Sequence, residues 1–158
     1  MNIQLQWYHG DMILQDHELL HFVQHNKINK IKYIGDSKYL EDIIGKKHSD
    51  IADMCIYLVN SFFDIQKVLE ICNQEIRCLP KNGIFYLSLN KFLLQSAPQQ
   101  QNIDANYDFA LRDFVIAHVH FPLLRYYSGA VDGGQRFNWV HPLTRFYFTN
   151  ENINLYRD

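Results

Sequence analysis

The chain has 158 residues, 47% of them hydrophobic and 20% charged, with a formal net charge of −2. The length suits one domain, and the apolar content excludes a disordered chain. Basic residues number 15 and acidic residues 17, so there is no excess of positive charge with which general nucleic-acid binders displace counterions from phosphates. We predict a single domain over residues 1–158 without general nucleic-acid binding.

The cysteines and the N-terminal residues indicate the compartment. Cys55 and Cys72 lie in apolar patterns, and Cys78 makes the number of cysteines odd. This usage favours free thiols in a reducing compartment over a disulfide framework. The N-terminus has no basic region followed by an apolar run, and no window approaches the roughly 18 apolar residues of a membrane span. We predict a cytoplasmic protein without a membrane segment.

Strand-like and helix-like patterns alternate in the first part of the chain. Apolar residues recur with a period of two in some segments and of about 3.6 in others. Ser37 suits an N-cap, and Gly45 suits a helix end. The patterns predict strands at 2–8 and 30–34, and helices at 15–26 and 37–44.

Residues 49–77 allow two interpretations. In the first, they form one long helix with an apolar stripe along one face. In the second, six consecutive apolar residues at 54–59 form a buried parallel strand, and Asn60 or Ser61 caps a helix over 62–77. We favour the strand followed by a helix, because the single helix would be unusually long.

The rest of the chain continues the alternation and ends in aromatic, strand-like sequence. Turn residues and a polar loop at 95–106 separate a strand at 84–89, a helix at 107–118, and strands at 123–127, 136–141 and 144–149. Strands that alternate with helices are typical of a mostly parallel sheet. We predict an α/β fold with a mostly parallel, Rossmann-like sheet, helices on both faces, and an antiparallel, aromatic-rich C-terminal end.

Polar side chains follow the ends of the predicted strands. Asp11 follows the first strand, Asp36 the second, and Asn90 with Lys91 the fourth. Ligands of parallel α/β sheets bind beyond the carboxyl ends of the strands. Asp11, Asp36, Asn90 and Lys91 are therefore the candidate catalytic residues. The alternative is that such residues end strands because they form turns and caps.

Residues 52–94 contain Asp53, the predicted strand at 54–59, a helix, the turn Leu79-Pro80-Lys81-Asn82-Gly83 and the strand at 84–89. This order resembles a segment of the class I methyltransferase core. The resemblance implies a Rossmann-like topology, with S-adenosylmethionine as an alternative cofactor. The first predicted strand leads into His9-Gly10-Asp11 instead of the family's glycine-rich cofactor turn. We therefore predict no cofactor.

The segment HELLH, residues 17–21, matches the HExxH pattern. On a helix, His17 and His21 share a face and can bind zinc, with Glu18 as general base; His25 extends that face. The glycine and spacing of the longer zinc-protease motif are missing. We expect histidines on a solvent-exposed helix face, with a metal site at His17, His21 and His25 as the alternative.

Arg112 and His118, separated by five residues and followed by His120, resemble the motif of HEPN ribonucleases. In that family the arginine and histidine converge on the scissile phosphate in an all-helical dimer, whereas the rest of this chain is rich in strands. We therefore expect a core or hydrogen-bonded role for these histidines. Residues 129–134 are glycine-rich but precede no Lys-Ser or Lys-Thr, which favours a hairpin loop over a P-loop.

The aromatic C-terminal end allows both core packing and a partner surface. Alternation on strands turns one set of side chains inward and leaves the other set exposed. Tyrosine, tryptophan and arginine dominate protein interfaces. The candidate partner-binding residues are Tyr126, Tyr127, Arg136, Trp139, Arg145 and Tyr147.

Small size, mild acidity and aromatic richness favour a non-catalytic binding protein, and no complete catalytic motif is recognised. We predict that it docks another protein, as a toxin-neutralising immunity protein or a small regulator. The alternative is a small enzyme. It would be either a reduced methyltransferase-like domain that uses the strand ends or a zinc hydrolase that uses His17, Glu18 and His21.

Overall fold

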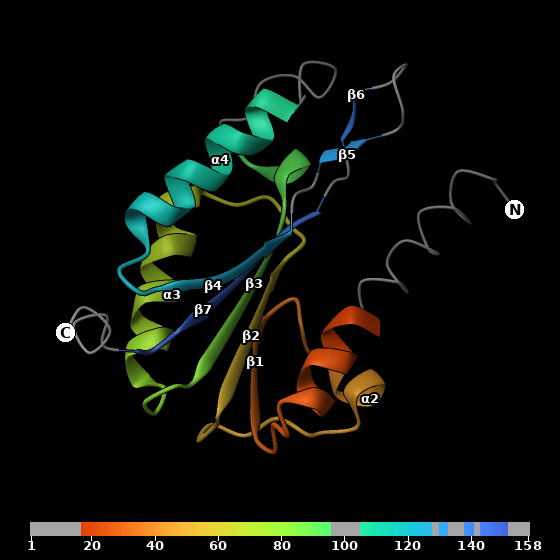
Figure 1. Cartoon of the computed structure of the whole chain (residues 1–158), viewed down its shortest axis with the longest axis vertical. Helices are drawn as coiled ribbons and strands as arrows, with labels where there is room; N and C mark the ends of the chain where they lie inside the picture. The colour runs from red at the N-terminus through yellow and green to blue at the C-terminus, as the bar shows by residue number, and fades with distance from the viewer. Residues whose placement is uncertain (1–16, 96–104, 128–129, 133–137, 141–142, 152–158) are drawn as a thin grey trace, which may run out of the picture.

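The computed structural model describes residues 17–95, 105–127, 130–132, 138–140 and 143–151 (Figure 1). The strand predicted at 2–8 lies outside these residues, as does Asp11. Residues 17–25 are helical. The elements that follow are β1 (Ile31–Gly35), α2 (Leu40–Ile44), β2 (Met54–Val59), α3 (Ile65–Cys78), β3 (Ile84–Asn90), the 3-10 turn η1 (Lys91–Leu93), α4 (Ala105–His118), β4 (Leu123–Tyr127), β5 (Ala130–Asp132), β6 (Asn138–Val140) and β7 (Leu143–Thr149).

The central sheet is mixed, with the strand order β1-β2-β3-β7-β4. β1, β2 and β3 pair in parallel, whereas β7 is antiparallel to both of its neighbours, β3 and β4. The predicted mostly parallel, Rossmann-like sheet is therefore wrong. The place beside β3 is taken by a late strand whose residues Phe146, Tyr147 and Phe148 are fully buried, as an internal strand requires. β5 and β6 form a separate antiparallel pair.

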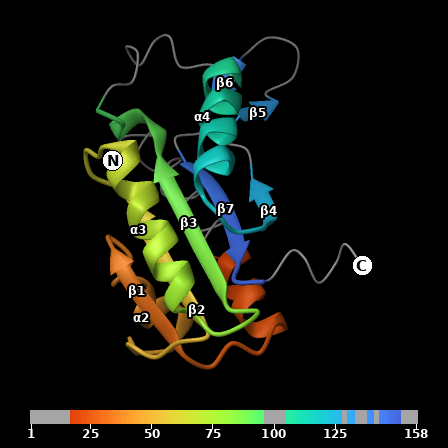
Figure 2. The same ribbon diagram turned by 90° about the vertical axis from the view of Figure 1, so that its left-hand side faces the viewer.

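One face of the sheet packs against α3 and α4 (Figures 1 and 2). Helix α3 turns one apolar stripe toward the sheet, with Val68, Leu69, Cys72 and Ile76 buried. Helix α4 contributes residues such as Val115, which is completely buried. These side chains meet the alternate residues of β2, β3 and β7 in one hydrophobic cluster.

The opposite face packs against residues 17–25 and α2. Leu19, Phe22 and Val23 from the first of these segments reach the sheet, where Phe22 lies with its ring centroid 4.4 Å from that of Tyr147. The spacing of these residues is that of one helix face, which agrees with the predicted amphipathic helix.

Residues 49–77 form a strand followed by a helix, so the favoured interpretation is confirmed. The predicted cap is wrong, however. Asp64 caps α3, with its Oδ1 accepting a hydrogen bond of 2.9 Å from the N–H of Gln66. Asn60 and Ser61 instead belong to the loop that precedes the helix.

The region around α2 differs from its prediction at one end only. The hydroxyl of Ser37 shares its one proton between the carbonyl oxygens of Ile34 (2.7 Å) and Ile56 (3.1 Å), so this side chain ties β1 to β2 instead of capping a helix. Gly45 ends α2 with a φ of 80°, and its N–H donates to the carbonyl of Glu41, as expected for a helix-ending glycine.

The cysteines are free, with Cys55 and Cys72 buried and Cys78 exposed. Burial raises the pKa of the Cys55 thiol to about 12, which makes it a poor nucleophile. No helix among the described residues is long and apolar enough to cross a membrane.

Candidate functional site

The carboxyl ends of β1, β2 and β3 finish at the same edge of the sheet, called here the carboxyl edge. Asp36 immediately follows β1 and holds the end of β2. Its Oδ2 accepts hydrogen bonds from the backbone N–H of Asn60 (2.8 Å) and from the Oγ of Ser61 (3.3 Å). Asp36 therefore links the residues that follow β1 to those that follow β2.

The end of β3 joins the same network. Asn90 donates from Nδ2 to the Oδ1 of Asn60 at 2.9 Å, and its own Oδ1 accepts from the N–H of Phe92 at 3.2 Å, which caps η1. Lys91 is fully buried and has an interaction partner. The side chains of Asp36 and Asn90 therefore serve the turns and caps at the strand ends, which was the alternative to a catalytic role.

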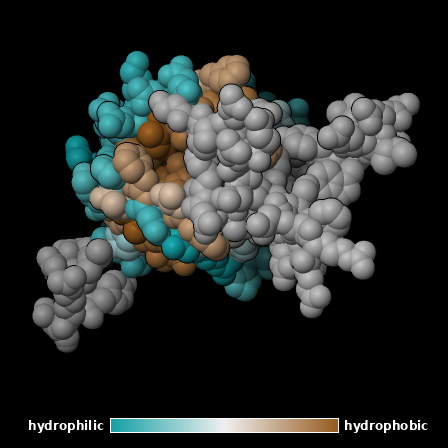
Figure 3. Space-filling view, turned by 90° about the horizontal axis from the view of Figure 1, so that it is seen from above, coloured by the Kyte–Doolittle hydropathy of each residue, from teal (hydrophilic) through white to brown (hydrophobic). Residues whose placement is uncertain are grey.

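A hollow of about 440 Å³ opens beside this network. Its lining includes Asp36 after β1, Tyr57 of β2, Phe62 in the loop after β2, and Lys67 and Ile71 in the first turns of α3. The Phe62 side chain is 75% exposed although phenylalanine is usually buried. Figure 3 looks onto this end of the molecule and shows hydrophobic side chains gathered around a hollow, beside hydrophilic ones.

Two further exposed apolar side chains lie at α2, which packs against the other face of the sheet. Asp36 also lines a second, smaller cavity, which it shares with Tyr39. Tyr39 is 47% exposed, and Ile43 stands one helical turn further along α2. We call Tyr39, Ile43, Phe62 and Ile71 the apolar rim; they are four of the eight large hydrophobic side chains exposed among the described residues.

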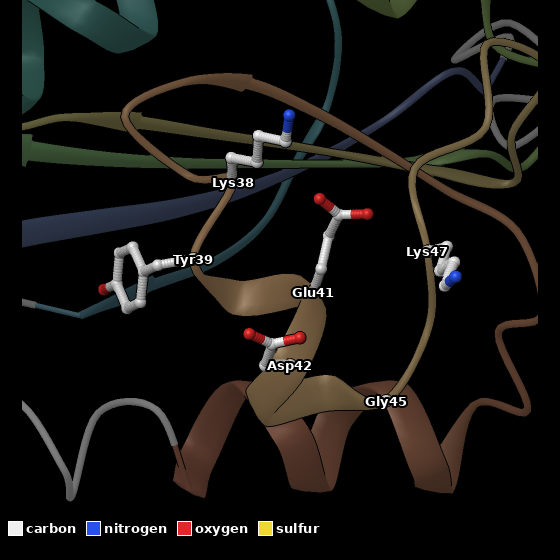
Figure 4. A pocket seen from close by; sticks show the side chains of 6 residues that line it. All are labelled: Lys38, Tyr39, Glu41, Asp42, Gly45 and Lys47. Atoms are coloured by element: carbon white, nitrogen blue, oxygen red, sulfur yellow. The ribbon is translucent and has the colours of Figure 1, made fainter.

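A further hollow, of about 670 Å³, surrounds α2 (Figure 4). Its side chains do not converge: Tyr39 and Lys47 stand on opposite sides of the helix, and the carboxylates of Glu41 and Asp42 lie apart. The Oε2 of Glu41 is already engaged, since it accepts from the N–H of His48 at 2.8 Å. This hollow therefore presents no converging set of catalytic groups.

The predicted C-terminal partner surface is only partly exposed. Tyr147 is fully buried in the core, so it belongs to the inward-facing set. Tyr126, Tyr127 and Arg145 are partly buried, and the guanidinium of Arg145 lies 4.8 Å from the ring centroid of Tyr127. Arg136 and the side chain of Trp139 lie outside what the structure describes.

The HELLH segment is split between two faces of its helix. His17, His21 and His25 are exposed, with the rings of His21 and His25 stacked 5.8 Å apart. Glu18 turns toward the sheet, where its two oxygens accept hydrogen bonds of 3.1 and 2.9 Å from the hydroxyl of Tyr147. Among the described residues, no group of three histidine, cysteine or acidic side chains is placed to hold a metal ion.

Glu18→Gln is expected to lower the free energy of unfolding by about 1–2 kcal/mol, because it removes a charge-assisted hydrogen bond to a buried hydroxyl. The His17→Ala/His21→Ala double variant, which changes exposed side chains, should stay within about 0.5 kcal/mol of the parent. Urea unfolding measures both values. A zinc-dependent rise in melting temperature that the double histidine variant abolishes would contradict this account and favour the metal site.

Arg112 and His118 do not converge. The guanidinium of Arg112 pairs with Asp113 at 2.8 Å and stacks over the Tyr126 ring, 5.7 Å from its centroid. His118 is exposed, with its Nδ1 at 2.8 Å from the carbonyl oxygen of Phe114. This carbonyl contact requires Nδ1 to carry the proton. The expected hydrogen-bonded role of this histidine is therefore confirmed.

Burial of tyrosines near the carboxyl edge makes stability sensitive to alkaline pH. Burial raises the pKa of Tyr57 to about 12, whereas an unfolded tyrosine ionises near pH 10. The unfolded state therefore loses protons first, and the stability that is complete below about pH 10 declines as the pH rises toward about 12. Between about pH 10 and pH 12, the melting temperature should fall less steeply with pH for Tyr57→Phe than for the parent protein. An equal slope in both proteins would show that Tyr57 does not cause this loss of stability.

No protein-family model matches the sequence, and no curated protein matches it.

The apolar rim could not be predicted from the sequence patterns, and the reason is local. Phe62 lies between the end of β2 and the Asp64 cap, and Ile71 lies off the buried stripe of α3. The available signal for an exposed apolar surface was that Phe62 and Ile71 both lie outside the periodic apolar pattern of the neighbouring helix and strand.

Proposed function

We propose that this chain is a non-catalytic, cytoplasmic binding protein that docks another protein through the apolar rim. A toxin-neutralising immunity protein or a small regulator fits this description. The observation that carries the proposal is the exposure of Phe62 beside a preformed hollow at the carboxyl edge. Exposed apolar groups gathered around a concavity and bordered by polar side chains are typical of interaction sites.

The polar network supports docking better than chemistry. The carboxylate of Asp36 fixes the loop that carries Phe62. It accepts hydrogen bonds from Asn60 and Ser61, the two residues that immediately precede Phe62. Asn90 braces the same loop from β3. A loop held at several points presents its aromatic side chain with little loss of conformational entropy on binding, and such preorganisation favours affinity.

The charges around the hollow favour a protein surface as the partner. Asp36 and Asp64 stand near Lys67 around one opening, so neither sign dominates. A mixed polar border around apolar anchors is the usual arrangement of a protein interface. The balanced charge of the whole chain supports the same conclusion.

Capture of partners from a lysate of the source organism tests the proposal. Immobilised parent protein, Phe62→Asp and Ile51→Asp are compared. Ile51 is a matched control because it is 81% exposed but precedes β2, at the opposite edge of the sheet. We expect a protein that the parent and Ile51→Asp retain and Phe62→Asp loses. Equal capture by all three would contradict the docking site. Stabilisation by S-adenosylmethionine without a captured protein would favour the enzyme alternative.

A further inference from the structure

Two buried side-chain atoms have no hydrogen-bond partner within the described residues: the Oγ of Ser88 and the Nε of Arg145. They are neighbours, because Ser88 on β3 is the register partner of Arg145 on β7. Directly paired residues of antiparallel strands project from the same face of the sheet, with their Cβ atoms about 5 Å apart. A buried polar group without a partner costs free energy, so two adjacent ones call for an explanation.

A small cavity adjoins Ser88, the register partner of Arg145. It has a volume of about 40 Å³, and Ser88, which is 1% exposed, contributes to its lining together with Leu58, Asn60 and Leu143. A water molecule needs at least about 10–15 Å³ of such space. The cavity therefore has room for a group of a few atoms and excludes large ligands. It lies beneath the carboxyl edge, with Asp36 also in its lining.

The chemistry of the two unpartnered atoms defines the ligand. The Nε–H of Arg145 is a donor on a side chain that is always charged, and the hydroxyl of Ser88 can donate as well. The guanidinium lies over the Tyr127 ring, and no ion pair is formed by Arg145 within the part of the chain that is described. We propose that Ser88 and Arg145 form a binding site for a small carboxylate, whose oxygens accept from both donors.

Asp36 adds selectivity to this site. Its carboxylate borders the cavity and repels an entering anion. The repulsion doubles for a divalent anion. In addition, the small cavity disfavours tetrahedral anions such as phosphate, because they are larger than a planar carboxylate. Formate and acetate should therefore bind better than phosphate. The site does not depend on the proposed docking of a protein, since it is formed within the free chain.

Formate titration of the purified full chain tests the site, with formate exchanged for chloride at fixed ionic strength. At about a hundredfold excess over its dissociation constant, formate should raise the melting temperature by roughly 5–10 °C. The Nε–H resonance of Arg145, identified by its loss in Arg145→Gln, should shift during the same titration. Phosphate should give a smaller response.

Three variants distinguish the site from a general salt effect. Ser88→Ala and Arg145→Gln should each lose the response to formate, whereas Arg125→Gln should keep it, because the Arg125 guanidinium stacks over the Phe22 ring away from the cavity. Ser88→Ala should also unfold at no lower temperature than the parent without formate, since it removes an unpartnered hydroxyl. A response that survives in Ser88→Ala and Arg145→Gln, or the absence of any response in the parent, would overturn the proposal.

Discussion

Gly35→Ala should lower the free energy of unfolding by about 3 kcal/mol or more. Gly35 ends β1 with a φ of +65°, a conformation that costs an alanine about 1–2 kcal/mol. An added Cβ would lie 2.5 Å from the carbonyl oxygen of Leu58 and 2.6 Å from the Tyr57 ring. The backbone oxygen cannot move aside without disturbing the β1–β2 pairing, so overpacking adds about 1–3 kcal/mol.

The same substitution should also loosen the carboxyl edge. The carbonyl oxygen of Leu58 accepts a hydrogen bond of 2.8 Å from the N–H of Asp36, which follows Gly35 directly. Gly45→Ala is the matched control, because Gly45 has a φ of +80° but nothing within 4 Å of an added Cβ. It should cost only about 1 kcal/mol. Urea unfolding of both variants checks the difference; equal losses would contradict the close packing at Gly35.

Phe62→Asp should weaken the affinity for the docked protein by roughly 30-fold or more, which corresponds to ~2 kcal/mol. Burying a phenylalanine side chain contributes about 1.5–3 kcal/mol, and the aspartate would place a charge against the partner's apolar surface. The folded state should be unaffected, because the Phe62 side chain is 75% exposed. Isothermal titration calorimetry with the purified partner measures the change.

Two comparisons make this result specific. Ile51→Asp introduces the same charge at an equally exposed apolar residue and should change the affinity by less than about twofold. Tyr39→Ser should weaken binding in the same direction as Phe62→Asp, because both side chains border cavities that contain Asp36. Unchanged affinity in Phe62→Asp would mean that the partner binds elsewhere.

The local elements could be predicted where the sequence is strongly patterned. Six consecutive apolar residues at 54–59 favoured an internal strand over a long helix, and the buried residues of α3 recur at helical spacing. Asp36 and Asn90 follow predicted strands and were candidate catalytic residues, but residues of these types also end strands because they form turns and caps. Because these side chains form turns and caps, their hydrogen-bonding groups are used within the fold and are not left for a substrate.

The place of β7 in the central sheet, beside β3, could not be predicted from the alternation of strands and helices alone. An apolar strand such as β7 has the same sequence pattern in a separate C-terminal hairpin and inside the central sheet, and only its pairing with β3 distinguishes the two positions. The exposure of Phe62 could not be predicted either, because phenylalanine side chains are usually buried. The partner candidates were assigned to the aromatic end, where Tyr147 in fact supports the core.

Hydrogen–deuterium exchange of the chain with and without its protein partner tests the docking surface most directly. Binding at the apolar rim predicts slower exchange at residues 36–43 and 60–71, which carry Tyr39, Ile43, Phe62 and Ile71. Residues 48–53, at the opposite edge around Ile51, should exchange unchanged. Protection confined to β4, or to any surface that excludes the apolar rim, would contradict the proposed docking site.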